Sequence, residues 1–166
     1  MSNVVLRPIS DNDTELIVKW RNNDAVKSKF IHRECTADMH RAWLKTMVQT
    51  GNVSQFIVEL DENPVGSVFL RDIDRKNMSA EFGIFIGEDN ARGVGCGTEA
   101  AKQIIEYGFS KLRLHRIFLR VLSSNSAAIR SYEKAGFLYE GCAKDMVYLD
   151  GKYIDVVFMS IINKEV

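Results

Sequence analysis

Apolar and polar residues alternate along several stretches of the chain, as in half-buried strands, and apolar residues recur every three or four positions along others, as in helices. The clearest alternation lies between 79 and 87, where every even-numbered residue from 80 to 86 is apolar. Strands are therefore expected near residues 4–9, 55–60, 66–72, 79–87, 116–122, 138–149 and 153–161. Helices are expected over 14–22 and 37–48, in a short segment that Gly136 ends, and along a stripe made by Ala100, Ala101, Ile104, Ile105, Phe109 and Leu112.

The order of these elements is a strand, two helices, three strands, a helix, a strand, a helix and two strands. This order predicts a mixed α+β fold. No repeat, linker or low-complexity tract interrupts the 166 residues. We therefore expect one domain over residues 1–166, which is long enough to bury a sizeable core.

The composition excludes several classes of protein. Lys and Arg number 22, as do Asp and Glu, whereas a general nucleic-acid binder carries an excess of basic residues. No apolar run approaches the roughly 20 residues that span a bilayer, and no charged and then apolar leader opens the chain. We expect a cytoplasmic protein without nucleic-acid or membrane partners. Its three Cys and three His residues are scattered, so no metal site is predicted.

The segment from Arg92 to Thr98, Arg-Gly-Val-Gly-Cys-Gly-Thr, follows an expected strand and opens an expected helix. Its glycines let backbone N–H groups approach phosphate oxygens, the helix N-terminus adds its positive dipole end, and Arg92 adds a fixed charge. The segment predicts a site for an anionic cofactor. Its third glycine comes one place too early for a dinucleotide fold, and no Gly-Lys-Ser or Gly-Lys-Thr occurs for a nucleotide-hydrolase loop.

Two motifs in this order resemble those of a known family. The spacing R-x-x-G-x-G from Arg92 resembles the pyrophosphate-binding motif of the GNAT N-acetyltransferases, and residues 125–137 resemble that family's N-x-x-A-I-x-x-Y-x-x-x-G-F signature. The resemblance covers roughly residues 56–161. It implies acetyl-CoA as cosubstrate without a metal, and a twisted, mostly antiparallel sheet of about seven strands with four helices. In that fold the fourth and fifth strands, here those beginning at Ser79 and Arg116, splay apart around the pantetheine arm.

The resemblance also implies roles for particular residues. Backbone groups of Phe85, Ile86 and Gly87 would pair with the pantetheine arm like an added strand. Asn125 would bind the arm or cap the helix that follows it. Tyr132 would protonate the leaving thiolate, the alternative being a half-buried packing residue. The diphosphate would be held by Arg92, Gly93, Val94, Gly95, Cys96, Gly97 and Thr98.

Glu81 is the candidate general base, because it is a carboxylate in an otherwise apolar strand. An amine with a pKa of about 10 must lose a proton before it attacks, and a carboxylate or a water chain beside one can accept it. The alternative for Glu81 is a carboxylate paired with Lys or Arg. Both interpretations stay open at the level of the sequence.

The acceptor is expected near the first two helices, where acceptor sites of the family lie. Basic residues outnumber acidic ones between 19 and 45, which favours an anionic acceptor over a polycation. Trp20, Arg21 and Asn22 resemble a stretch of acetyltransferases that act on nucleotide-linked amino sugars, so these residues and Glu81 are the candidate acceptor-binding set. Residues 80–82 and 112–116 instead resemble polyamine and ribosomal-protein N-terminal acetyltransferases.

Two classes of function follow from these residues. The first is an N-acetyltransferase for the primary amine of a small molecule, leaning towards a nucleotide-linked amino sugar, with a polyamine or a protein N-terminus as the alternative. The second is a non-catalytic acyl-CoA-binding module, which would need the phosphate site but no proton donor. Tyr132 and Glu81 favour the enzyme. The long final strands could pair with a second copy in a homodimer.

Overall fold

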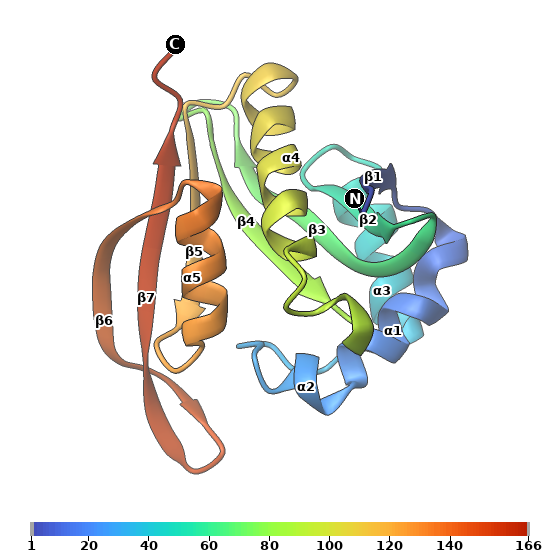
Figure 1. Ribbon diagram of the computed structural model, residues 1–166, viewed down its shortest axis with the longest axis horizontal. Helices are drawn as coiled ribbons and strands as arrows, with labels where there is room; N and C mark the ends of the chain where they lie inside the picture. The colour runs from blue at the N-terminus through green and yellow to red at the C-terminus, as the bar shows by residue number, and fades with distance from the viewer. Residues whose placement is uncertain (1, 166) are drawn as a thin grey trace.

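The computed structural model describes residues 2–165 of the protein. Its strands form one sheet in the order β1-β2-β3-β4-β5-β7-β6 (Figure 1). Neighbouring strands are antiparallel except β4 and β5, which are parallel. The expected α+β class and mostly antiparallel seven-stranded sheet are therefore confirmed. The strands are β1 (Val4–Pro8), β2 (Ser54–Leu60), β3 (Asn63–Asp74), β4 (Ser79–Ile86), β5 (Arg116–Leu122), β6 (Leu138–Leu149) and β7 (Lys152–Ile162).

The helices follow the expected positions with two differences. The helix expected over 37–48 is α-helical only to Trp43 and continues as a π-helical turn, Leu44–Val48. A one-turn helix that was not expected follows α1, because the Asn23 side chain accepts a hydrogen bond from the Ala25 amide at 3.0 Å and caps a new helix. The α-helices within residues 2–165 are α1 (Thr14–Asn22), α2 (Asp24–Lys27), α3 (Ala37–Trp43), α4 (Cys96–Ser110) and α5 (Ser126–Ala135).

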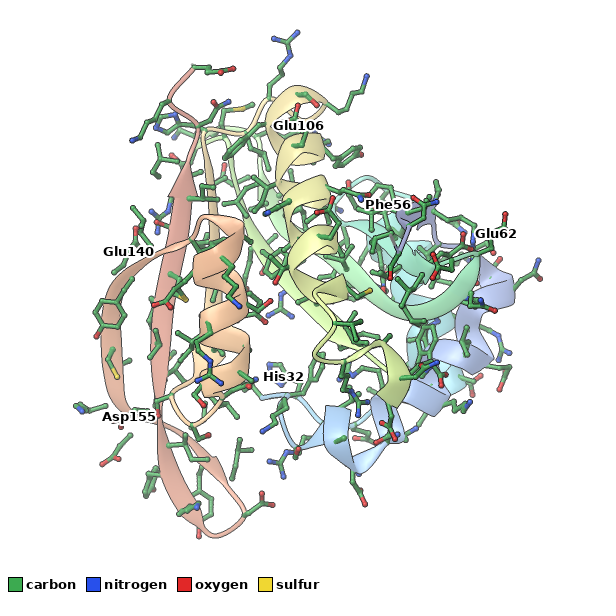
Figure 2. The ribbon with its side chains drawn as sticks, viewed as in Figure 1. His32, Phe56, Glu62, Glu106, Glu140 and Asp155 are labelled. Carbon is green, nitrogen blue, oxygen red and sulfur yellow. The ribbon has the colours of Figure 1, made fainter. Side chains whose placement is uncertain are left out.

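The outer strand β6 is tied to β5 across the intervening strand β7. Arg116 on β5 donates two hydrogen bonds of 2.6 Å to the carboxylate of Glu140, which lies at this edge of the sheet (Figure 2). Ser160 on β7 donates a third hydrogen bond of 2.6 Å to the same carboxylate. These contacts hold the C-terminal strands together.

No helix among the described residues is long and apolar enough to cross a membrane.

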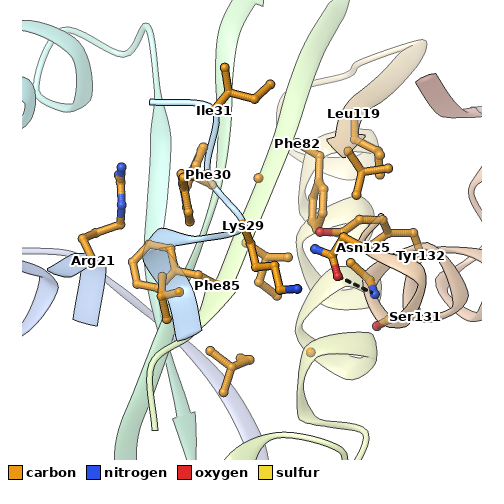
Figure 3. A pocket seen from close by; sticks show the side chains of 18 of the residues that line it. Arg21, Lys29, Phe30, Ile31, Phe82, Phe85, Leu119, Asn125, Ser131 and Tyr132 are labelled. Carbon is orange, nitrogen blue, oxygen red and sulfur yellow. Dashed lines mark hydrogen bonds between the residues drawn. The ribbon is translucent and has the colours of Figure 1, made fainter. Parts of the chain in front are cut away.

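The two parallel strands part shortly after they begin. Pairing between β4 and β5 is confined to residues 79–81 and 116–118. Beyond that point β4 stays paired with β3 as far as Ile86, and β5 stays paired with β7 as far as Leu122. The expected splay of the fourth and fifth strands is therefore confirmed. It leaves one unpaired edge on each strand, and a cavity lies between these edges (Figure 3).

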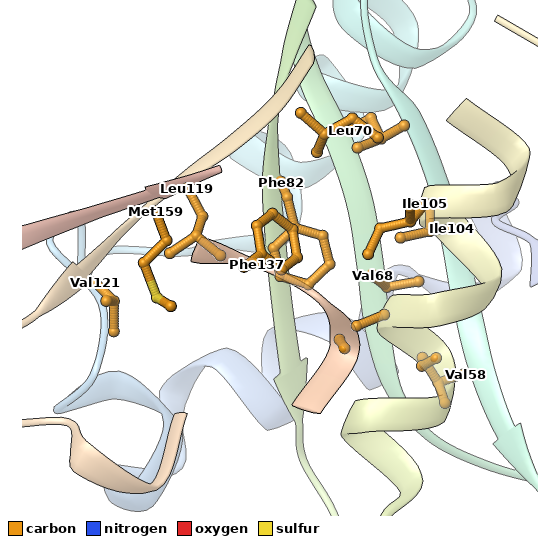
Figure 4. Packing of buried hydrophobic residues seen from close by; sticks show 14 of the residues in the cluster. Val58, Val68, Leu70, Phe82, Ile104, Ile105, Leu119, Val121, Phe137 and Met159 are labelled. Carbon is orange, nitrogen blue, oxygen red and sulfur yellow. The ribbon is translucent and has the colours of Figure 1, made fainter. Parts of the chain in front are cut away.

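Helices cover both faces of the sheet. On one face α4 contacts β3 and β4, and on the other α1 contacts β3. Because side chains alternate along a strand, Phe82 of β4 enters the core under α4, whereas Phe85 enters the core under α1. Glu81 has the same parity as Phe85 and therefore faces the α1 side. The core under α4 includes Val68, Leu70, Phe82, Ile104 and Phe137 (Figure 4).

Candidate active site

A cavity of about 750 Å³ occupies the gap between β4 and β5. We call the part lined by wall residues from segments 91–98 and 125–134 the loop side. The part lined by wall residues from segment 17–43, together with Phe69, Arg71, Glu81 and Arg120, is the α1 side. Figure 3 shows Tyr132 and Asn125 at one end and Arg21 at the other, with Phe30, Phe85 and Lys29 between them. The loop side contains residues expected to bind the cofactor, and the α1 side contains Arg21 and Glu81 of the set expected to bind the acceptor.

The start of α4 presents unpaired amides to the loop side. Gly95 is the N-cap residue with a φ of 86°, and Gly93 has a φ of 74°, both in the left-handed region that favours glycine. The first helical hydrogen bond runs from the Glu99 amide to the Gly95 carbonyl at 3.0 Å. The amides just before Glu99 therefore have no helical acceptor. Free amides at the positive end of a 15-residue helix suit a diphosphate.

Two residues of the predicted diphosphate site direct their side chains elsewhere. Val94 is 58% exposed and is absent from the cavity wall, and Cys96 is 2% exposed within the core under α4. Only their main-chain groups are placed to reach a phosphate. The cavity wall itself includes Arg92, Gly93, Gly95, Gly97 and Thr98.

Arg92, which was expected to add a fixed positive charge, uses its side-chain donors within the protein. Its Nε donates to the Ile86 carbonyl at 2.9 Å and its Nη2 to the Gly87 carbonyl at 3.0 Å. Its Nη1 pairs with the carboxylate of Asp89. Arg92 therefore fastens the glycine segment to the end of β4. This contact positions the free amides relative to the splayed edge.

Hydrogen bonds at the two ends of β4 show which of its backbone groups face the gap. The Gly87 amide donates to the Val65 carbonyl at 2.7 Å, and the Arg116 amide donates to the Met78 carbonyl at 3.2 Å. Since backbone groups alternate along a strand, odd-numbered residues of β4 bond to β3 and even-numbered ones face β5 or the gap. The expectation of free groups at Phe85 and Gly87 is corrected accordingly. The edge groups belong to residues 82, 84 and 86, and the Ile86 carbonyl accepts from Arg92.

Trp20 is a core residue in this structure, although it was a candidate for acceptor binding. It is 1% exposed, is absent from the cavity wall, and donates from Nε1 to the Glu88 carboxylate at 2.7 Å. Its ring lies directly on the backbone of Gly87, where an added Cβ would be 2.1 Å from the ring. Gly87 is thus required by the packing of Trp20.

Gly87→Ala is expected to lower the free energy of unfolding by about 1–3 kcal/mol, because a methyl group would overpack a buried ring. The matched control is Gly141→Ala on β6, where an added Cβ meets nothing within 4 Å and φ is not left-handed. Urea unfolding of both variants measures the difference. Equal free energies of unfolding for Gly87→Ala and Gly141→Ala would contradict the close packing of the Trp20 ring on Gly87.

Tyr132 on α5 directs a phenol into the cavity. Its ring packs against Phe82 and Phe137 with centroids 5.5 and 6.1 Å away. The side chain is half-buried, and burial raises the pKa of its hydroxyl to about 12. The hydroxyl therefore stays protonated at neutral pH, as a proton donor must. The geometry suits a general acid, and that role stays a prediction.

Asn125 caps α5 and also lines the cavity. Its Oδ1 accepts a hydrogen bond from the Ala128 amide at 3.4 Å. Capping was one of the two roles expected for it. Its contact with a pantetheine arm stays a prediction.

Glu81 is held by two guanidinium groups. Arg120 donates to its carboxylate at 2.8 and 3.2 Å, and Arg71 donates at 3.2 Å. Burial of this 4% exposed residue would raise the pKa of the carboxyl group, but the hydrogen bonds from Arg120 and Arg71 outweigh it and lower the pKa. A carboxylate so stabilised is a weak proton acceptor. The geometry favours the paired alternative over the general base.

The side chains of Trp20, Arg21 and Asn22 on α1 reach different surroundings, because successive side chains on a helix point about 100° apart. Trp20 enters the core, and Arg21 reaches the cavity wall. Asn22 donates from Nδ2 to the Cys35 carbonyl at 3.0 Å and is absent from the wall. Of the W-R-N stretch, only Arg21 is placed to meet an acceptor.

Several other residues on the α1 side were not predicted, because segment 28–36 has neither helical nor strand periodicity and His40 belongs to no motif. The wall there also contains Phe30, His32, Cys35 and His40. Nδ1 of His40 lies 3.0 Å from the Thr14 hydroxyl, and burial lowers the pKa of its imidazole. His40 is therefore neutral near pH 7. Among residues 2–165, no group of His, Cys, Asp and Glu side chains is arranged to hold a metal ion.

Comparison with known proteins agrees with this geometry. Residues 3–138 match the acetyltransferase (GNAT) domain family. The chain is 30% identical over 163 residues to spermidine N(1)-acetyltransferase of Escherichia coli K12, covering 98% of this chain and 87% of that protein. It is 26% identical over 162 residues to L-amino acid N-acetyltransferase of the same organism, covering 96% and 98%.

The similarity extends to a solved structure. A crystal structure of spermidine N-acetyltransferase from Vibrio cholerae in complex with CoA and spermine has a TM-score of 0.88 to this protein at 28% identity, covering 96% of this chain and 95% of that one. The glycine segment at the start of α4 and the splayed strands thus occur in a fold that binds CoA. Together these findings identify an acetyl-CoA-dependent N-acetyltransferase, and the chain belongs to the GNAT family.

Proposed function

We propose that the protein transfers the acetyl group of acetyl-CoA directly to the primary amine of a small molecule. One observation carries this proposal: the free amides of α4, the unpaired edge of β4 and the phenol of Tyr132 line the same cavity. The α4 amides bind the diphosphate, and the β4 edge receives the amides of the pantetheine arm. Tyr132 donates a proton to the departing thiolate.

The chain contributes mainly position and charge to this reaction. Acetyl-CoA supplies the activated acyl group. Holding the amine about 3–3.5 Å from the thioester carbonyl converts binding into a high effective concentration. Because Glu81 is paired with two arginines, we assign it to positioning Arg71 and Arg120, and the proton of the amine leaves to solvent through the cavity.

The relatives support a polyamine acceptor rather than the nucleotide-linked amino sugar towards which the sequence leaned. The Escherichia coli relative at 30% identity is named for spermidine, and the Vibrio cholerae enzyme was crystallised with spermine. Another relative is named for L-amino acids. Since relatives of similar length use different amines, the acceptor has to be determined on this protein.

Release of free CoA tests the function. The protein is incubated with acetyl-CoA and spermidine, L-amino acids, a UDP-linked amino sugar or an N-terminal peptide, and the thiol is measured. We expect turnover with at least one of these amines. Binding of CoA without turnover across the whole panel would instead support the non-catalytic acyl-CoA-binding module.

Gly97→Ala tests the predicted diphosphate site without disturbing the fold. An added Cβ would make only ordinary contacts, 3.8 Å from Ile86 and 4.0 Å from Ser131. Yet it would stand among the free amides, where a phosphate must come close. We expect an unchanged or higher melting temperature and a roughly 10-fold or greater loss of CoA affinity by calorimetry. Unchanged affinity, with Gly141→Ala as reference, would place the diphosphate elsewhere.

Pairing with a second copy, expected from the long final strands, stays a prediction. A structure of the spermidine N-acetyltransferase from Vibrio cholerae is dodecameric. The described outer strand β6 exposes Leu138, Tyr139 and Tyr148. These side chains are available to an assembly of copies of this chain.

A further inference from the structure

Arg21 is a partly buried cation on the cavity wall, and no carboxylate among residues 2–165 forms an ion pair with it. Its guanidinium stacks on the Phe30 ring with 3.9 Å between Cζ and the ring centroid, and Nη2 donates to the His32 carbonyl at 2.6 Å. Nε is buried and has no hydrogen-bond partner within the described part of the chain. The aromatic ring and the carbonyl fix the orientation of the guanidinium but neutralise none of its charge.

The surroundings of Arg21 add positive charge. Burial lowers the pKa of its guanidinium, nearby Arg71 lowers it further, and only Cys35 acts in the other direction. Burial also raises the pKa of the Cys35 thiol, so the thiol is neutral near pH 7. An Arg side chain stays protonated in such a setting. Burying an unpaired charge costs free energy, and a bound anion would recover that cost.

The wall of the α1 side carries more positive than negative side chains. The carboxylates on this wall are Glu34, which is exposed, and Glu81, which is already paired with two arginines. Among the described residues of this wall, no buried carboxylate is left unpaired to bind a polycation. The cations on the wall are Arg21, Lys29, Arg71 and Arg120.

We infer that Arg21 binds an anionic group, a carboxylate or a phosphate, on the amine that is acetylated. This inference rests on the proposed acetyl transfer and departs from the polyamine that the relatives suggest. Arg21 and Tyr132 lie at opposite ends of the cavity in Figure 3. The acceptor is therefore an elongated amine whose anionic group is separated from its reacting nitrogen.

Matched pairs of acceptors test this inference. One pair is 4-aminobutyrate and 1,4-diaminobutane, and the other is glucosamine 6-phosphate and glucosamine. Initial rates of CoA release give kcat/KM, and calorimetry of the CoA-loaded protein gives the affinity for each compound. We expect the anionic member of at least one pair to be favoured by about 10-fold or more, as for a hydrogen bond to a charged group.

Arg21→Gln should abolish most of that preference. The ratio of kcat/KM between anionic and uncharged or cationic partners is expected to fall about 10- to 100-fold, through KM and not kcat. Arg21→Lys should restore part of it. Lys102→Gln, an exposed change on α4, is the control for a lost positive charge. A purely structural role for Arg21 would lower the rates of both partners equally.

The inference is overturned if no anionic member is acetylated faster or bound more tightly than its partner, whether or not spermidine is a substrate. It is also overturned if Arg21→Gln leaves the ratio unchanged. Loss of acetyl transfer with every amine, or of CoA binding, would instead contradict the proposed function. The two failures are therefore distinguishable.

Discussion

Replacing Tyr132 by Phe is expected to lower kcat by about 100- to 10,000-fold, the usual contribution of a general acid. The substitution removes the hydroxyl and keeps the ring that packs against Phe82 and Phe137. Stability and CoA affinity should therefore change little. Free CoA is measured at saturating acetyl-CoA, and CoA binding by calorimetry.

The pH dependence adds a second test of the same role. Because the pKa of Tyr132 is raised to about 12, its hydroxyl keeps its proton throughout the neutral range. Loss of that proton therefore sets no limb of the rate profile near pH 7. Tyr139→Phe on β6, where the side chain is 61% exposed, is the matched control. An unchanged kcat in Tyr132→Phe would make Tyr132 a packing residue.

Replacing Glu81 by Gln is expected to reduce the free energy of unfolding by about 2–4 kcal/mol, because it leaves two guanidinium groups facing each other without their shared carboxylate. The arginine side chains remain 28–29% exposed, which places the loss towards the lower end. For a chain of this size the melting temperature should fall by roughly 5–15 °C. Urea and thermal unfolding give both values.

Glu15→Gln is the control, since Glu15 also pairs with an arginine, Arg41, but its side chain is 77% exposed. This substitution should lower the free energy of unfolding by less than about 1 kcal/mol, as for other exposed ion pairs. Equal losses at the two positions would contradict the buried pairing of Glu81. A variant Glu81→Gln that kept full stability and lost only activity would restore the general base.

Lowering the pH should remove the stability that Glu81 provides relative to Gln at the same position. The pKa of Glu81 in the folded protein lies below its ordinary value of 4.5, so its stabilisation is fully present above that ordinary value. It is lost as the pH falls through the lowered folded-state pKa. The stability difference between the wild-type protein and Glu81→Gln should be constant near pH 7 and shrink below about pH 4.5.

Local patterns predicted the elements well, and they predicted one part of the site. The residue pattern of 92–98 places glycines where the chain needs left-handed φ angles and where a helix begins, and both properties depend on neighbours in sequence. Periodicity likewise predicted β4 and α4. The one-turn helix α2 was missed because four residues are too few to show a helical period.

Contacts between distant segments changed the interpretation of several candidate residues. Glu81 is paired with an arginine 10 residues earlier and another 39 residues later. Trp20 of α1 packs directly on Gly87, just after β4. No pattern within a strand or a helix reports such partners. The sequence therefore could not tell a free carboxylate from a paired one.

The sequence by itself determined the order of the elements, the glycine-rich start of α4 and the placement of a phenol after it, because these depend on backbone preferences over a few residues. The tertiary structure decided which of those groups are free to act. Arg92 and Glu81 are engaged by the protein, whereas Arg21 faces the cavity and pairs with no carboxylate in the described part of the chain. The reason is physical: whether a charge is available depends on the groups that folding brings within hydrogen-bond distance, and these come from other strands and helices.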